Sequence, residues 1–135
     1  MKKTRHLVLD SWAVLAFFED QPSGQKAADI IADAHESGAS LLMSAVNAGE
    51  IWYITARQTS EAQADHLIRE VEQLGIEIVS ADWSTAREAA WIKSQVKMSY
   101  ADCFAFALAK IHRAELVTGD PEFKQLERQI KIRWI

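Results

Sequence analysis

The sequence predicts an α/β fold with a mostly parallel sheet of about five strands, and two observations support this. Short apolar runs without regular polar alternation recur along the chain, as in His6–Leu9 and Glu115–Thr118. Such runs are typical of parallel strands that helices cover on both faces. Longer stretches with apolar residues at helical spacing lie between them, and this alternation indicates βαβ crossovers.

The expected elements follow one another in a regular order. Strands are expected at residues 6–10, 40–43, 76–79, 115–118 and 130–134. Helices are expected at residues 12–18, 25–36, 45–57, 60–74, 82–93 and 99–111, with a short helix after Pro121. The segment 21–24 contains proline and glycine, so it is expected to form the turn after the first helix.

Length and composition limit the organisation of the chain. It has 135 residues, 49% of them hydrophobic and 25% charged, so we expect a single domain over residues 1–135. The basic start leads into only about four apolar residues, too few for a signal peptide or a membrane span, so we expect a cytoplasmic protein without membrane contact. Cys103 is the only cysteine, which excludes an intramolecular disulfide and a thiolate zinc cluster. We expect it in the core.

The net charge of −4 argues against a large basic surface for nucleic acid. Acids that bind divalent cations would, however, neutralise part of that charge. Net charge alone therefore does not decide the substrate.

Four carboxylates stand at element ends or on apolar faces: Asp10, Glu50, Asp102 and Asp120. Two of them end strands, and the other two lie on helices that begin just after strand ends. All four can therefore reach one carboxyl edge of a parallel sheet, where ligands of open α/β sheets bind. Ionised together they would repel, and hard cations such as Mg²⁺ or Mn²⁺ would relieve this repulsion.

Each acid also has a local explanation. Asp10 and Asp120 can cap the helices that follow them, Asp120 with a proline at the first helical position. Asp102 follows a serine by three residues, as in a capping box with Asp in place of Glu. Glu50 lies too far into its helix for a cap, and its alternative is a solvated residue reaching toward Arg57. Taken singly, these alternatives stay open.

Absent motifs narrow the chemistry. The four histidines are scattered without zinc-site spacing, and the sequence has neither a nucleotide-cradling glycine loop nor a G-x-S-x-G elbow. Of the reaction types considered, hydrolysis assisted by metal ions is the one that the sequence still favours.

Four segments in a fixed order resemble the PIN-domain ribonucleases, and most closely the VapC-type toxins of prokaryotic toxin–antitoxin pairs. They are LVLDSWAVLA at 7–16, SAVNAGEIWY at 44–53, SYADCFAFALA at 99–109 and LVTGDPEF at 116–123. The resemblance covers essentially the whole chain and implies a three-layer α/β/α PIN-like fold. It implies that Asp10, Glu50, Asp102 and Asp120 are the catalytic and metal-binding residues, supported by Ser11, Asn47 and Thr118. Trp12 departs from the small or polar residue that many relatives carry there.

The resemblance also implies an activity and partners. A Mg²⁺- or Mn²⁺-dependent endoribonuclease with one or two ions would cleave RNA by activating water, leaving a 5′-phosphate and a 3′-hydroxyl. It would act as the toxin of a VapBC-type pair, as a homodimer with a VapB-like antitoxin. The apolar helix at 12–18, with Trp52 and Tyr53, is a candidate groove for an antitoxin segment.

Two other enzyme classes lack a required residue, and two further functions stay open. A haloacid-dehalogenase-like phosphotransferase needs a second Asp two positions after Asp10, where Trp12 stands. A phosphoacceptor receiver domain needs acids beside the first strand's Asp, and Leu9 precedes it. A catalytically silent PIN module that binds RNA or protein, and a housekeeping RNA-processing nuclease, remain as alternatives.

Overall fold

Five parallel strands form one sheet in the order β3-β2-β1-β4-β5. The computed structural model describes residues 5–19 and 22–135. Val8 of the central strand pairs with Leu42 on one side and Leu116 on the other. The strands are β1 (His6–Leu9), β2 (Ser40–Ser44), β3 (Ile76–Val79), β4 (Glu115–Thr118) and β5 (Ile132–Trp134). Asp10 therefore follows the middle strand of the sheet.

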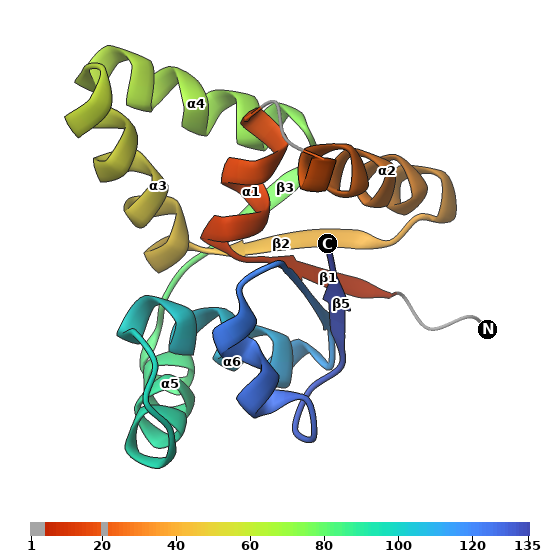
Figure 1. Ribbon diagram of the computed structural model, residues 1–135, viewed down its shortest axis with the longest axis vertical. Helices are drawn as coiled ribbons and strands as arrows, with labels where there is room; N and C mark the ends of the chain where they lie inside the picture. Colours follow the sequence, from red (N-terminus) through yellow and green to blue (C-terminus); the bar gives the residue numbers. More distant parts are fainter. Residues whose placement is uncertain (1–4, 20–21) are drawn as a thin grey trace.

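Helices cover both faces of the sheet, as Figure 1 shows. One layer contains α1 (Ser11–Phe18), α2 (Pro22–Ser37), α3 (Ala45–Gln58) and α4 (Glu61–Gln73). The opposite layer contains α5 (Trp83–Gln95) and α6 (Tyr100–His112), and the 3-10 helix η1 (Pro121–Leu126) follows β4. Two hydrophobic clusters, one on each face of the sheet, form the core. The predicted three-layer α/β/α architecture with five strands is confirmed, and every strand pair is parallel.

The start of α2 corrects one expectation. Residues 22–24 belong to this helix and not to the turn predicted at 21–24, of which Gln21 lies outside the described residues. Proline is accepted at the first helical position because its missing N–H has no intrahelical partner there. Gly24 is buried against α1, where an added Cβ would lie 2.4 Å from the carbonyl oxygen of Ala16. This glycine thus allows close helix packing.

Two smaller outcomes concern the other elements. The last strand begins at Ile132, two residues later than expected, because Ile130 still belongs to the buried end of the preceding loop. Cys103 is fully buried, as predicted. None of the helices in residues 5–19 and 22–135 is both long enough and apolar enough to cross a membrane.

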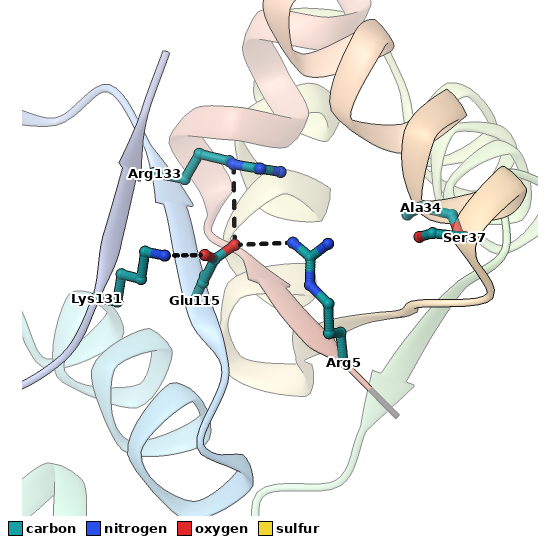
Figure 2. A network of polar contacts seen from close by, with 6 residues as sticks. All are labelled: Arg5, Ala34, Ser37, Glu115, Lys131 and Arg133. Atoms are coloured by element: carbon teal, nitrogen blue, oxygen red, sulfur yellow. Dashed lines mark hydrogen bonds and ion pairs between the residues drawn. The ribbon is translucent and has the colours of Figure 1, made fainter. Parts of the chain in front are cut away.

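Cationic side chains gather at the amino edge of the sheet around Glu115, the first residue of β4 (Figure 2). Its carboxylate lies 2.9 Å from Lys131 Nζ, 3.4 Å from Arg5 Nη2 and 3.8 Å from Arg133 Nε. Hydrogen bonding and attraction to these cations outweigh partial burial and lower the pKa of Glu115. The cluster ties the start of β1 to β5 across β4.

Candidate metal centre

Asp10 is a buried carboxylate at the carboxyl end of the central strand. Only 1% of the residue is exposed. Its Oδ1 accepts a hydrogen bond of 2.8 Å from the backbone N–H of Ala13, so it caps α1. Its Oδ2 accepts a hydrogen bond of 2.5 Å from the hydroxyl of Thr118, at the end of the neighbouring strand. The two strand ends are thereby joined through one carboxylate.

Thr118 connects two of the predicted acids. Its fully buried hydroxyl donates to Asp10 and accepts a hydrogen bond of 3.0 Å from the backbone N–H of Asp120. Asp120 in turn caps η1, because its Oδ1 accepts from the N–H of Glu122 at 3.0 Å. The Thr118 hydroxyl therefore links the buried Asp10 to the backbone of Asp120 through two hydrogen bonds.

Three carboxylates, including that of Asp120, lie close together next to this hydrogen-bonded link. Single oxygens of Asp102, Asp120 and Glu122 all lie within 4.8 Å of one another. Asp102 is held in the first turn of α6, where Ser99 caps the helix and accepts a 3.2 Å hydrogen bond from the Asp102 N–H. The structure thus brings Asp102 and Asp120 together, as the sequence predicted, and adds Glu122.

Glu122 was missed in the sequence. The sequence around it, with Pro121 directly before it, predicts only a turn into a short helix. The available signal was its place in the first turn of that helix, where its side chain lies beside the capping acid. A second acid at this position increases the negative charge next to Asp102.

Glu50 lies on α3 at the edge of the cluster and is partly exposed. Its charge acts on Asp102 and raises the pKa of that residue, so the two carboxylates are near each other. It is not among the three acids whose oxygens lie within 4.8 Å. Glu50 therefore flanks the cluster, and Asp10 lies buried next to it.

Asn47 connects three acid-bearing elements. Its backbone carbonyl accepts a 3.2 Å hydrogen bond from the hydroxyl of Ser11, which is next to Asp10. Its side-chain amide donates to the carbonyl of Ala101, next to Asp102, at 3.1 Å. The residue is fully buried, and its Oδ1 has no hydrogen-bond partner among the described residues. Ser11 and Asn47 thus hold the starts of α1 and α6 against α3.

Burial and crowding raise the pKa of Asp10. Loss of hydration is the main cause, hydrogen bonds from Thr118 and Ala13 oppose it, and the charges of Asp102 and Asp120 add to it, giving a pKa of about 7. Without a cation, this carboxyl group therefore holds its proton at mildly acidic pH.

Asp102 is shifted in the same direction. Burial is again the main cause; a hydrogen bond with Ser99 opposes it, and the charges of Asp120, Glu50 and Glu122 contribute, so that the pKa of Asp102 is about 6. The ion pairs found among the described residues involve neither the three clustered acids nor the neighbouring Asp10 and Glu50. These carboxylates thus have no ion-pair partner in the part of the chain that the structure describes.

This donor set fits a hard divalent cation. All candidate ligands are carboxylate oxygens, which Mg²⁺ and Mn²⁺ prefer over nitrogen or sulfur. A cation between Asp102, Asp120 and Glu122 would remove the repulsion that raises the pKa of Asp102. Asp10 and Glu50 stand beside these three and complete the acidic edge.

Comparison with known proteins identifies the fold family. The PIN domain family model matches residues 7–129. No curated protein sequence matches this chain significantly. Among solved structures, VapBC2 from Rickettsia felis bound to a promoter DNA fragment is similar, with a TM-score of 0.77 and 12% identity over 95% of this chain and 97% of that chain.

Two further solved structures have the same fold. VapBC-1 from nontypeable Haemophilus influenzae has a TM-score of 0.72 and 14% identity, covering 96% of this chain and 97% of that chain. Mycobacterium tuberculosis VapC20, a sarcin-ricin loop cleaving toxin, has a TM-score of 0.67 and 14% identity, covering 88% and 93%. Because the family model extends from the central strand to beyond the acids that follow β4, the chain belongs to the PIN domain family.

Proposed function

We propose that this protein is a Mg²⁺- or Mn²⁺-dependent endoribonuclease and the toxin of a VapBC-type pair. One observation carries the proposal: carboxylates from β1, α3, α6 and η1 gather at the carboxyl edge of a parallel sheet without a cationic partner among the described residues. Uncompensated carboxylates of this kind are a costly arrangement unless they bind cations.

The proposed roles follow from position. Asp102, Asp120 and Glu122 would hold one or two cations, with Asp10 and Glu50 as further ligands. The bound cation would supply Lewis-acid activation of water and charge neutralisation at the scissile phosphate. Asn47, Ser11 and Thr118 hold the acid-bearing elements in register through the hydrogen bonds described above. No histidine is required as a general base.

RNA cleavage tests the proposal directly. The protein, purified free of any partner, is expected to cut RNA with Mg²⁺ or Mn²⁺, to leave 5′-phosphate ends and to stop when EDTA removes the metal. Asp10→Asn and Asp102→Asn should abolish cleavage. Asp29→Asn is the matched control, because Asp29 is an exposed acid on α2 that pairs with Gln25. Equal cleavage by the two site variants and the parent would refute the assignment, and no cleavage by the parent would favour a silent PIN module.

The antitoxin is proposed to bind along α1. A hollow of about 240 Å³ is lined by Trp12, Leu15, Ala16 and Glu19. It offers apolar surface along α1, which suits the apolar face of an amphipathic segment. The similar solved structures from Rickettsia felis and Haemophilus influenzae are VapBC structures, which supports a VapB-like partner.

The toxin role has a cellular test. Expression of the chain alone is expected to arrest growth, and co-expression of a small neighbouring open reading frame should relieve the arrest. Harmless overexpression would favour the housekeeping nuclease. We also propose that the protein is cytoplasmic and forms a homodimer, for which the exposed aromatic residues Tyr53 on α3 and Trp91 on α5 offer an apolar surface. Light scattering of the purified protein measures this state.

A further inference from the structure

The indole ring of Trp12 lies directly against the backbone of Gly119. A Cβ added to Gly119 would be 2.3 Å from both Cη2 and Cζ3 of the indole and 2.8 Å from Cε3. Real Cβ atoms essentially never approach another heavy atom that closely. The six-membered half of the indole therefore covers the position that any other side chain would occupy.

Gly119 is required for space and not for backbone conformation. The glycines with positive φ in the described part of the chain are Gly38 and Gly75. An alanine at position 119 could thus adopt the local backbone, but the Trp12 ring would have to move to make room for its methyl group. Trp12 and Gly119 form a matched pair across α1 and the end of β4.

This pair lies at the centre of the acidic edge. Gly119 stands between Thr118, whose hydroxyl binds Asp10, and Asp120, whose N–H binds that same hydroxyl. Asp120 then accepts from the N–H of Glu122. The turn that carries Asp120 and Glu122 is therefore fixed by this short chain of hydrogen bonds and by the indole packed on Gly119.

We propose that Trp12 is a positioning residue that holds the turn 118–120 in place, so that the carboxylates of Asp120 and Glu122 face Asp102. In this role, the indole limits how far Gly119 can move toward α1. Supporting residues of this kind typically change metal affinity about 10- to 100-fold when they are removed. The metal half of this inference rests on the proposed function, whereas the positioning of the turn is a property of the chain alone.

Two measurements on the full chain test the inference. In EDTA, the amides of Asp120 and Glu122 in Trp12→Ala should exchange hydrogen roughly tenfold faster than in the parent, because the hydrogen bonds that protect them open more often. By calorimetric titration with Mn²⁺, folded Trp12→Ala should bind about 10- to 100-fold more weakly, and Trp12→Phe should recover most of the affinity.

A compensating pair makes the test specific. Gly119→Ala should weaken Mn²⁺ binding as Trp12→Ala does, because the methyl group and the indole cannot share the site. The double variant should bind no more weakly than Trp12→Ala alone, since the clash needs the ring. Trp83→Ala is the matched control, because Trp83 is 74% exposed on α5. It should leave both exchange and affinity unchanged.

The outcomes separate this inference from the proposed nuclease function. Unchanged exchange at residues 120 and 122 and unchanged Mn²⁺ affinity in Trp12→Ala would overturn the positioning role. A lower melting temperature with parental affinity and exchange would reduce Trp12 to a packing residue and also overturn it. A parent that binds Mn²⁺ and does not cut RNA would refute the nuclease function and leave the positioning role to be judged on exchange and affinity. A parent that binds no metal would refute the metal site, and exchange alone would then decide.

Discussion

Three consecutive residues at the start of α1 reach three different parts of the acidic edge. Asp10 binds Thr118 at the end of β4, Ser11 binds the backbone of Asn47 on α3, and Trp12 covers Gly119. The first turn of a helix projects successive side chains in different directions, which makes this division possible. A single helix start thereby links the central strand to its neighbours.

Replacing the Thr118 hydroxyl is expected to be costly. In Thr118→Val, the Oδ2 of Asp10 and the N–H of Asp120 both lose their partner while staying buried or partly buried. An unsatisfied buried group of this kind costs about 1–3 kcal/mol. Chemical denaturation should show a loss of that size, and titration should show weaker Mn²⁺ binding.

Thr118→Ser is the control for that variant, because it keeps the hydroxyl and removes only a methyl group. It should retain most of the Mn²⁺ affinity. If valine and serine variants bound metal equally well, the hydroxyl would have no part in arranging the acids.

At the scale of whole elements, capping and site formation are the same interaction. Asp10 and Asp120 were open to interpretation either as helix caps or as ligands, and each does cap a helix through one oxygen. A carboxylate has two oxygens, so a cap leaves the second free for another contact. For Asp10, that second contact is the Thr118 hydroxyl. The caps are thus observed, and the ligand role stays a prediction that they do not exclude, because each carboxylate oxygen can accept more than one contact.

The cap of α6 gives a prediction at this scale. Ser99→Ala removes the acceptor for the Asp102 N–H and should lower stability by about 1 kcal/mol. It should also weaken Mn²⁺ binding, because the hydrogen bond of Ser99 favours the ionised form of Asp102. Thermal denaturation and Mn²⁺ titration measure the two effects.

Ser60→Ala is the matched control, since Ser60 caps α4 in the same way through the N–H of Gln63. It should lower stability by a similar amount, about 1 kcal/mol, with parental metal affinity. Equal affinity losses in both variants would mean that general destabilisation, and not the position of Asp102, controls binding.

Across the whole molecule, opposite charges collect at opposite edges of the sheet. The carboxyl edge carries the five acids of the candidate metal centre, and the amino edge carries Arg5, Lys131 and Arg133 around Glu115 (Figure 2). The net charge of −4 conceals this separation. Only at the amino edge is the charge compensated within the described residues, so stability should depend on what neutralises the other edge.

The uncompensated acids predict that the stability of the metal-free protein falls as the pH rises. In the folded state the pKa values of Asp10 and Asp102 are about 7 and about 6, above the ordinary value of 3.8. At pH values between the ordinary and the raised pKa, the folded state therefore holds more protons than the unfolded state. Stability in EDTA should therefore fall as pH rises, by on the order of 2 kcal/mol from about pH 5 to about pH 7, mostly because of the buried Asp10, since solvent screens the partly exposed Asp102. Denaturation across that range measures the slope.

Saturating Mn²⁺ should reverse the slope, because metal binding displaces those protons and strengthens with pH. Asp10→Asn and Asp102→Asn should each flatten the EDTA profile, since neither amide titrates. A parent whose stability in EDTA did not change between these pH values would contradict the raised pKa values.

Element boundaries show where local sequence was sufficient. β3 and β4 match the predicted segments 76–79 and 115–118, because glycine or polar residues bound each apolar run. The turn predicted at residues 22–24 is wrong, because each of these residue types has a second use. Proline is also accepted at the first position of a helix, and glycine also allows close helix packing. The contact between Gly24 and Ala16 decides which applies, and it joins two different helices.

The amino-acid sequence was sufficient to predict the parallel sheet and the gathering of Asp10, Glu50, Asp102 and Asp120 at one of its edges. Those features follow from apolar periodicity and from where polar residues end each run, together with the family resemblance. Three features could be seen only in the folded chain: Glu122 lies beside Asp102 and Asp120, the Thr118 hydroxyl is hydrogen-bonded to Asp10, and Trp12 packs on Gly119. Each of these depends on distances between segments as far apart as 108 residues, which no local pattern encodes.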